Sequence, residues 1–158
     1  MTTVAVEALL YQLDAAFEGE DWHSVLSNLS AVRPEHWLWV PSGGQRSIRD
    51  IVSHVGSCKY MYENHAFGDA TFQWDDPLVT GVDVLGDAPS AIAWVREGHA
   101  RLRRSITRLE DGDLVRPRRH HSGKVRETRW IITITIQHDL YHAGEINHIR
   151  ALACGDDA

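Results

Sequence analysis

The sequence predicts an all-α protein, a four-helix bundle with a long crossover connection between its second and third helices. Apolar residues recur at helical spacing in four segments, and residues 69–89 between the second and third segments show no sustained period. Only one short run rich in β-branched residues resembles a strand. The chain has 158 residues, 43% hydrophobic and 24% charged, which is ordinary usage for one globular domain spanning 1–158.

The first apolar stripe is interrupted. Residues 5–17 carry apolar side chains three and four positions apart, the run 19–21 (Gly-Glu-Asp) breaks this pattern, and residues 22–32 resume it. We therefore expect a long first helix that is broken near residue 20.

A connection with two prolines follows. Pro34 and Pro41 bracket the segment EHWLWV, and PSGG at 41–44 is typical of a tight connection between regular elements. We interpret Trp37 and Trp39 as core or dimer-surface residues, because large aromatic side chains usually contribute packing area.

The second helix has clear signals at both ends. Ser47 is a suitable N-cap with Asp50 three residues later, as in a capping box, and Gly68 is a suitable end. The helix carries His54 and Cys58. Its apolar stripe consists of Ile48, Ile51, Val52, Val55, Tyr62 and Ala66.

Residues 69–89 are rich in Asp, Gly and Pro, so we expect a long connection that crosses and wraps the bundle. Long connections often carry function. Phe72 and Trp74 are therefore candidates for one wall of a substrate pocket.

The third helix should begin at Asp87 or Ser90 and end before the DGD at 111–113. One face of it carries Ile92, Val95, His99, Leu102, Ile106 and Leu109.

The fourth segment contains an ambiguity, because WIITITI at 130–136 has the composition of a strand. The helical interpretation explains more residues. At about 100° per residue, one set of side chains falls within roughly 80° of arc over about six turns, which exceeds the length of an ordinary strand. The set comprises Ile131, Ile134, His138, His142, Glu145, Ile149 and Leu152.

Charge and composition exclude several classes of function. The formal net charge of −6 argues against nucleic-acid binding, and RPRRHH at 116–121 is a local basic cluster of a kind common in loops. No apolar run approaches about 18 residues, and the N-terminus lacks a basic segment followed by a long apolar one. We therefore expect a cytoplasmic protein without membrane contact. The two cysteines, Cys58 and Cys154, lie far apart and form no CxxC pair, which disfavours a disulfide framework.

The last segment carries the strongest chemical signal. His138 and His142 are four residues apart on the core-facing stripe, a spacing that lets two imidazoles share one metal ion. Two structural histidines satisfied by their neighbours are the competing interpretation. Glu145 on the same stripe favours a metal site, either as a ligand, as a hydrogen-bond acceptor from a ligand, or as a catalytic base that acts on a water molecule.

A catalytic zinc site usually has three protein ligands, so another helix must supply the third. His54 is our candidate, although it lies roughly 80° from the centre of its apolar stripe. Cys58 is a competing ligand, or a small buried apolar residue. Three further helical histidines are expected at the surface or at a helix flank: His65, His99 and His148.

Two segments resemble the signature segments of the DinB-like (DinB/YfiT-like) family of metalloenzymes. They are SIRDIVSHVGSCKYMYENHAFG at 47–68 and HDLYHAGEINHIRALA at 138–153. The resemblance implies a four-helix bundle with one histidine from the second helix and two from the last, here His54, His138 and His142. It also implies one divalent metal ion, zinc or nickel, and frequently a homodimer.

The resemblance implies the reaction less directly. Some relatives are similar to S-transferases in which a low-molecular-weight thiol, such as mycothiol or bacillithiol, attacks a small electrophilic substrate. A metal-dependent hydrolase that uses a water molecule, with Glu145 as base, is one alternative. A non-catalytic metal-binding stress protein is the other.

Overall fold

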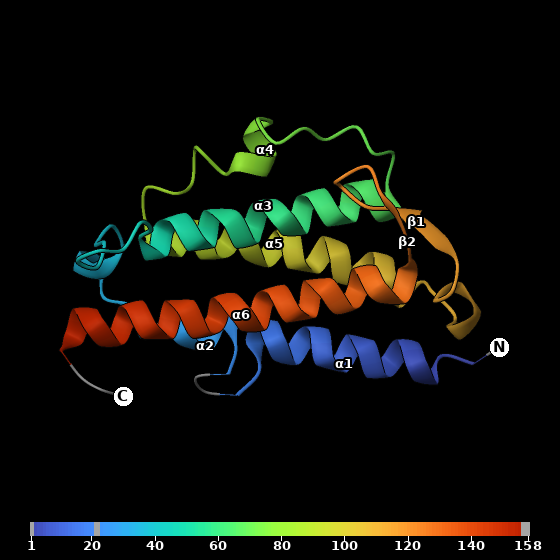
Figure 1. The fold of residues 1–158 in the computed structure, drawn as a ribbon, viewed down its shortest axis with the longest axis horizontal. Coiled ribbons are helices and arrows are strands. Elements are labelled where there is room, and N and C mark those ends of the chain that lie inside the picture. The colour runs from blue at the N-terminus through green and yellow to red at the C-terminus, as the bar shows by residue number, and fades with distance from the viewer. Residues whose placement is uncertain (1, 21–22, 156–158) are drawn as a thin grey trace.

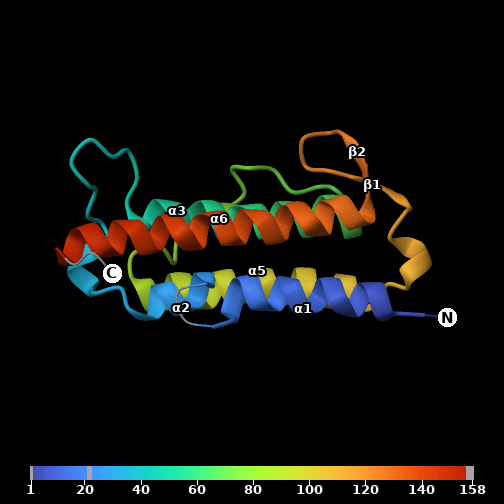
Figure 2. The same ribbon diagram turned by 60° about the horizontal axis from the view of Figure 1, so that its bottom comes forward.

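The computed structural model describes residues 2–20 and 23–155 and shows a bundle of long helices with one small hairpin (Figure 1). The long helices are α1 (Val4–Glu18), α3 (Ile48–Phe67), α5 (Ala88–Thr107) and α6 (Thr128–Cys154). Helix α6 packs against α1 and α3, and α5 packs against the same two helices from the other side. Figure 2 shows the two resulting layers, with α3 and α6 above α5 and α1. The predicted all-α fold is confirmed.

The break in the first apolar stripe is present. Helix α1 ends at Glu18, and a short helix α2 (Val25–Ser30) continues along α6. Ser24 caps α2, because its hydroxyl accepts from the Ser27 N–H at 3.3 Å. Residue 21 of the predicted break and residue 22, where the pattern was expected to resume, lie outside the described part of the chain. A 3-10 turn, η1 (Pro34–His36), follows.

Helix α3 begins as predicted. Ser47 is its N-cap, its hydroxyl accepts from the Asp50 N–H, and the Asp50 carboxylate accepts from the Ser47 N–H at 2.9 Å. Gly68 ends the helix. The segment before α3 is held by Trp37, which is buried in the core and donates its indole N–H to the Leu85 carbonyl at 3.1 Å. Trp39 is half-buried and packs against the same core.

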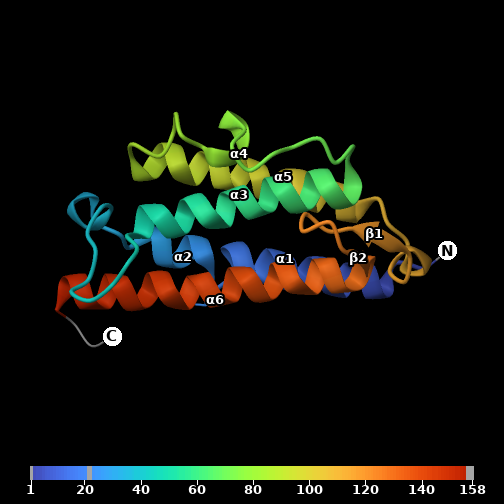
Figure 3. The ribbon, with the colours of Figure 1, turned by 45° about the horizontal axis from the view of Figure 1, so that its top comes forward.

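The connection between α3 and α5 crosses the outside of the bundle along α3 and contains one short helix, α4 (Pro77–Thr80) (Figure 3). It returns the chain to the end of the bundle where α3 begins, so α5 runs in the same direction as α3 (Figure 1). The long connection therefore joins two parallel helices. Two buried hydrogen bonds fasten the connection, from the Ser57 hydroxyl to the Val79 carbonyl and from the Trp94 indole to the Leu78 carbonyl.

The sequence predicts no sheet, and this is wrong for residues 117–127. Strand β1 (Pro117–Arg119) pairs antiparallel with β2 (Val125–Glu127) after a 3-10 turn, η2 (Asp111–Asp113). The hairpin holds most of the basic cluster beside the end of α3 (Figure 1). There Arg118 donates to the Ala66 carbonyl at 3.1 Å and lies over the Phe67 ring.

Helix α6 includes the whole ambiguous run 130–136, so the helical interpretation is confirmed. Ile131 and Ile132 are fully buried there, whereas a strand would place adjacent side chains on opposite faces. The helix ends at Gly155, which adopts a left-handed conformation with φ 70°. Within the described ranges, none of the helices combines the length and apolar character needed to span a membrane.

Candidate metal centre

The structure brings together the three histidines that the sequence selected. His54 projects from α3, and His138 and His142 project from successive turns of α6. The Nε2 atoms of His54 and His138 are 3.0 Å apart, and one potential ligand atom from each of the three residues lies within 4.8 Å of the other two. Sequence spacing placed the pair on α6, and the packing of α3 on α6 adds the third imidazole.

These distances and donor atoms fit a divalent metal ion. A tetrahedral zinc ion with Zn–N distances of about 2.0–2.1 Å separates its nitrogen ligands by about 3.3 Å. The 3.0 Å between the Nε2 atoms of His54 and His138 is close to that value. Three imidazoles form the kind of donor set that zinc and nickel accept. The cluster is therefore compatible with metal binding.

The three imidazoles differ in burial, so the cluster has a closed side and an open side. His142 is buried, His138 is half-buried and His54 is exposed. Burial, followed by the charges of His142 and His54, lowers the pKa of His138 to about 3. Burial is also the main cause of the lowered pKa of His54. Neutral imidazoles keep the lone pair that a metal ion requires.

Glu145 contacts the closed side of the cluster. Its Oε2 atom lies 2.8 Å from Nδ1 of His142, one turn earlier on α6. A carboxylate in this position accepts the Nδ1 proton and leaves Nε2 of His142 free as a ligand atom. Of the three roles considered for Glu145, this contact favours the hydrogen-bond acceptor.

Cys58, the competing ligand, follows His54 by one turn of α3 and lies outside the cluster. Its Sγ atom is 3.9 Å from Nε2 of His54, and the side chain is buried. Burial raises the pKa of the Cys58 thiol to about 12, so the thiol is protonated at neutral pH. This is the environment of a small apolar residue rather than that of a thiolate ligand.

The remaining helical histidines lie outside the cluster. His148 is exposed, and Nε2 of half-buried His65 lies 3.0 Å from the Phe72 carbonyl oxygen. The expectation for His99 was wrong, because this residue is buried and its ring stacks on Phe17 with 4.0 Å between centroids. Its position on the apolar face of the third helix was the signal that favoured burial.

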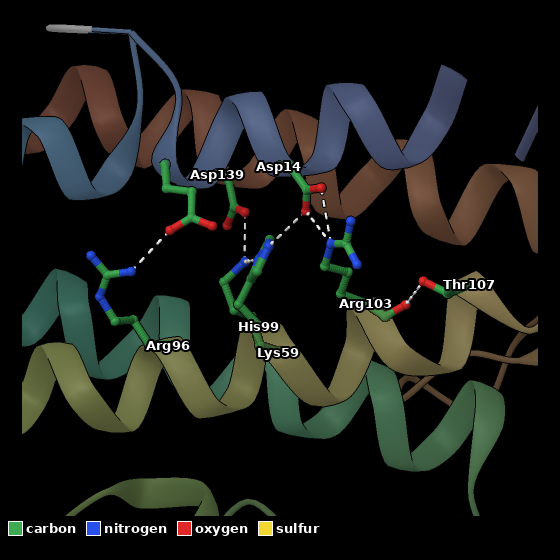
Figure 4. Close-up of polar contacts among 8 residues, drawn as sticks. Asp14, Lys59, Arg96, His99, Arg103, Thr107 and Asp139 are labelled. Atoms are coloured by element: carbon green, nitrogen blue, oxygen red, sulfur yellow. Dashed lines mark hydrogen bonds and ion pairs between the residues drawn. The ribbon is translucent and has the colours of Figure 1, made fainter. Parts of the chain in front are cut away.

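The sequence interpretation missed a buried ion pair behind the cluster. Lys59 of α3 and Asp139 of α6 are 2.5 Å apart, and their side chains are 1% and 0% exposed (Figure 4). Lys59 had a signal in the sequence, because it lies at helical spacing from Val55 and Tyr62 on the apolar stripe of α3. A lysine in that position needs a buried partner.

His99 extends this ion pair toward the surface. Burial, followed by the charge of Lys59, lowers the pKa of His99 to about 2, so the imidazole is neutral. Its Nδ1 atom is 3.4 Å from the Lys59 ammonium and can accept from it, and its Nε2–H is then directed to Asp14 at 3.3 Å (Figure 4). Arg103 donates to the same Asp14 carboxylate at 2.9 Å. All four helices of the bundle therefore contribute to one polar network.

Aromatic side chains from three segments of the chain meet at the hairpin. His121 of the hairpin contacts Tyr62 of α3, with 4.9 Å between ring centroids, and Trp74 of the long connection, with 5.1 Å. Burial, followed by the charges of His120, His65 and His54, lowers the pKa of His121 to about 4. Trp74 is 46% exposed and available to other molecules.

The fold and the site together define a class, an all-helical protein with a three-histidine cluster compatible with metal binding. The family model of the DinB superfamily matches residues 19–146, and the chain belongs to this superfamily. The matched range contains all three histidines and Glu145. A comparison with curated proteins gave no match.

Proposed function

We propose that His54, His138 and His142 hold one divalent metal ion, zinc or nickel, and that the protein is a metal-dependent S-transferase for a low-molecular-weight thiol. The observation that supports this proposal is the convergence of three imidazoles at a site that is open on the side of His54. A structural zinc site would instead be closed by a fourth protein ligand.

When bound, the metal would lower the pKa of a coordinated thiol or water enough to supply a nucleophile at neutral pH. The three imidazoles leave the charge of the ion uncompensated, which favours an anionic further ligand such as a thiolate. Glu145 orients His142, and exposed His54 leaves the approach open to a small electrophile. Because Glu145 is engaged with His142, it is poorly placed to act as the base of a hydrolase.

Metal analysis tests the first half of the proposal. Alanine substitution of His54, His138 or His142 should lower the metal content sharply while the helical circular dichroism spectrum remains. His148→Ala is the matched control, because this exposed residue lies on α6 outside the cluster. Full metal content in the triple-alanine variant would place the metal elsewhere.

A thiol-consumption assay tests the second half. The metal-loaded protein is incubated with a small electrophile and with several low-molecular-weight thiols in turn, and loss of free thiol is measured. Metal-dependent consumption supports the transferase. Turnover of an ester or amide without thiol would identify the hydrolase, and stoichiometric metal binding without either activity would identify the non-catalytic protein.

A further inference from the structure

A small polar cavity of about 230 Å³ lies between the C-terminal halves of α3 and α5, and none of the three clustered histidines lines it. The two helices pack side by side and run in the same direction (Figure 1). The volume is below the range of about 300–1,000 Å³ that drug-sized ligands occupy, so the cavity suits a small ion or a single polar group. Its lining comes from α3, from α5 and from the C-cap of α5: Glu63, Arg101, Arg104, Ser105 and Arg108.

The three arginines of this cavity face the same way. At about 100° per residue, they fall within roughly 60° of arc on α5. The helix dipole favours cations in the last turn, which accounts for Arg104 and Arg108 but not for Arg101, nearly a turn earlier. Like charges three and four positions apart on a helix repel one another. A bound anion would relieve this repulsion.

Carboxylates of the protein compensate the three charges only in part. Glu63 is the one carboxylate of the lining among the described residues, and its Oε1 atom accepts from the Ser105 hydroxyl at 2.9 Å. Its Oε2 atom lies 3.6 Å from Arg101, which is a loose ion pair. Arg104 pairs with Glu97 outside the cavity, but both side chains are more than half exposed, so this pair contributes little. Within the lining, three guanidinium groups therefore face one carboxylate.

The cavity combines a fixed guanidinium with a free one. The Arg101 guanidinium lies over the rings of Tyr60 and Phe72, 5.6 Å from each centroid, and these contacts hold it in place. Arg108 is exposed and has no ion pair or hydrogen bond with another residue in the described part of the chain. A donor that is already positioned lowers the entropic cost of binding a ligand. A free donor can then close on the ligand from the other side.

We propose that this cavity binds a phosphate dianion, either inorganic phosphate or the phosphate group of a small monoester. Guanidinium groups present paired N–H donors that match phosphate oxygens. A phosphate monoester carries about −1.5 to −2 charges at neutral pH, which balances the excess of two positive charges in the lining, whereas a carboxylate would balance one. The site is separate from the proposed metal centre and does not depend on the S-transferase function.

The test titrates the protein with inorganic phosphate and with glycerol 3-phosphate at neutral pH and constant ionic strength, with chloride as the balancing anion. Binding is followed through the Nε–H signal of Arg101 in a proton–nitrogen correlation spectrum. We expect a saturable shift with one site per chain. Arg108→Gln should weaken binding about tenfold, the value of one charge-assisted hydrogen-bonded pair. Glu63→Gln should tighten binding, because it removes the carboxylate that repels the ligand.

Arg96→Gln is the matched control. Arg96 is an exposed residue of α5 outside the cavity, and its substitution removes the same charge. Its affinity for both probes should equal that of the wild type. Circular dichroism of each variant verifies that the helices are retained.

The outcomes decide the proposal in either direction. A shift that rises linearly without saturation, equal affinities in the wild type and Arg108→Gln, or weaker binding in Glu63→Gln would each overturn the site. Opposite effects of Arg108→Gln and Glu63→Gln support it. Saturable binding of both probes then identifies the group of a small monoester, and binding of inorganic phosphate alone identifies the free ion.

Discussion

The Lys59 ammonium and the Asp139 carboxylate form a fully enclosed ion pair that joins α3 to α6 directly behind the histidine cluster. Lys59 follows His54 by five residues, and Asp139 is the neighbour of His138. The ion pair therefore fixes how far α3 can slide along α6. That register sets the distance between His54 and the two histidines of α6.

Breaking this ion pair should be costly. Lys59→Met or Asp139→Leu leaves one buried charge without its partner, and we expect each to lower the free energy of unfolding by about 3–5 kcal/mol. The double variant should recover much of this loss, because it buries no charge. Urea denaturation of the four proteins completes the cycle. Glu18→Gln is the control, since its pair with Arg96 is about half exposed and should contribute less than about 1 kcal/mol.

His99 should make the fold sensitive to acid. Its pKa falls from 6.5 to about 2 on folding, so between these values the unfolded chain binds more protons than the native state. The contribution of neutral His99 to the free energy of unfolding is thus fully present above pH 6.5. It falls as the pH drops through that window, by at most about 1.4 kcal/mol per pH unit. His99→Gln should be less stable at pH 7.5 yet lose less on acidification. Urea unfolding at pH 7.5 and 5.0 measures both changes. An equal loss in both proteins would contradict the assignment. The charged neighbours of His99 are unchanged in His99→Gln, so the comparison isolates the imidazole. They are Lys59, Asp14, Arg96 and Arg103.

Cys58 should be unreactive in the native protein. Its thiol is buried and has a pKa of about 12, whereas Cys154 is half-buried at the end of α6. With a chromogenic disulfide at pH 8, we expect one fast thiol per chain and a second only in denaturant. Cys154→Ser should abolish the fast reaction. Cys58→Ala should keep its metal, and loss of the metal would instead make Cys58 a ligand.

Glu145→Gln tests the hydrogen bond to His142. Loss of a carboxylate that orients a ligand usually weakens metal binding by about 10- to 100-fold, and we expect that range in chelator competition. A direct ligand would lose the metal as completely as the histidine variants do. An unchanged dissociation constant would show that the 2.8 Å contact does not support the site. Glu97→Gln, at an exposed position of α5, is the control.

Two glycines within helices should respond oppositely to alanine. A Cβ atom at Gly56 of α3 would lie 2.1 Å from the Trp94 ring, so Gly56→Ala must displace a core indole and should cost more than about 2 kcal/mol. A Cβ atom at Gly144 of α6 meets nothing within 4 Å, so Gly144→Ala should stabilise the protein by up to about 1 kcal/mol. Thermal unfolding of both variants compares them directly.

Helical periodicity and cap signals predicted most of the fold. Ser47 and Gly68 marked the two ends of α3, and the stripe through His138 and His142 identified α6 despite its strand-like start. The hairpin at 117–127 escaped prediction because it is exposed and mostly polar, so it lacks an alternating apolar pattern. Contacts of Arg118 with the end of α3 hold it instead.

The candidate site was predictable to the extent that its residues are close in sequence. The spacing of His138 and Glu145 on one helix face follows from the helix itself. The Lys59–Asp139 pair spans 80 positions, and only the packing of two helices reveals it. Likewise, periodicity placed His54 at the flank of its stripe, which is why this residue reaches the open side of the cluster.

The separation of the three histidines along the chain also determines when the site can form. His54 and His138 are 84 positions apart, and the two histidines of α6 come from the last long helix of the bundle. During synthesis, His54 is available long before its partners, so until α6 is made the chain holds only one imidazole of the site and no cluster. The proposed metal uptake would then begin only after α6 docks, and metal occupancy would report that folding of the bundle has finished.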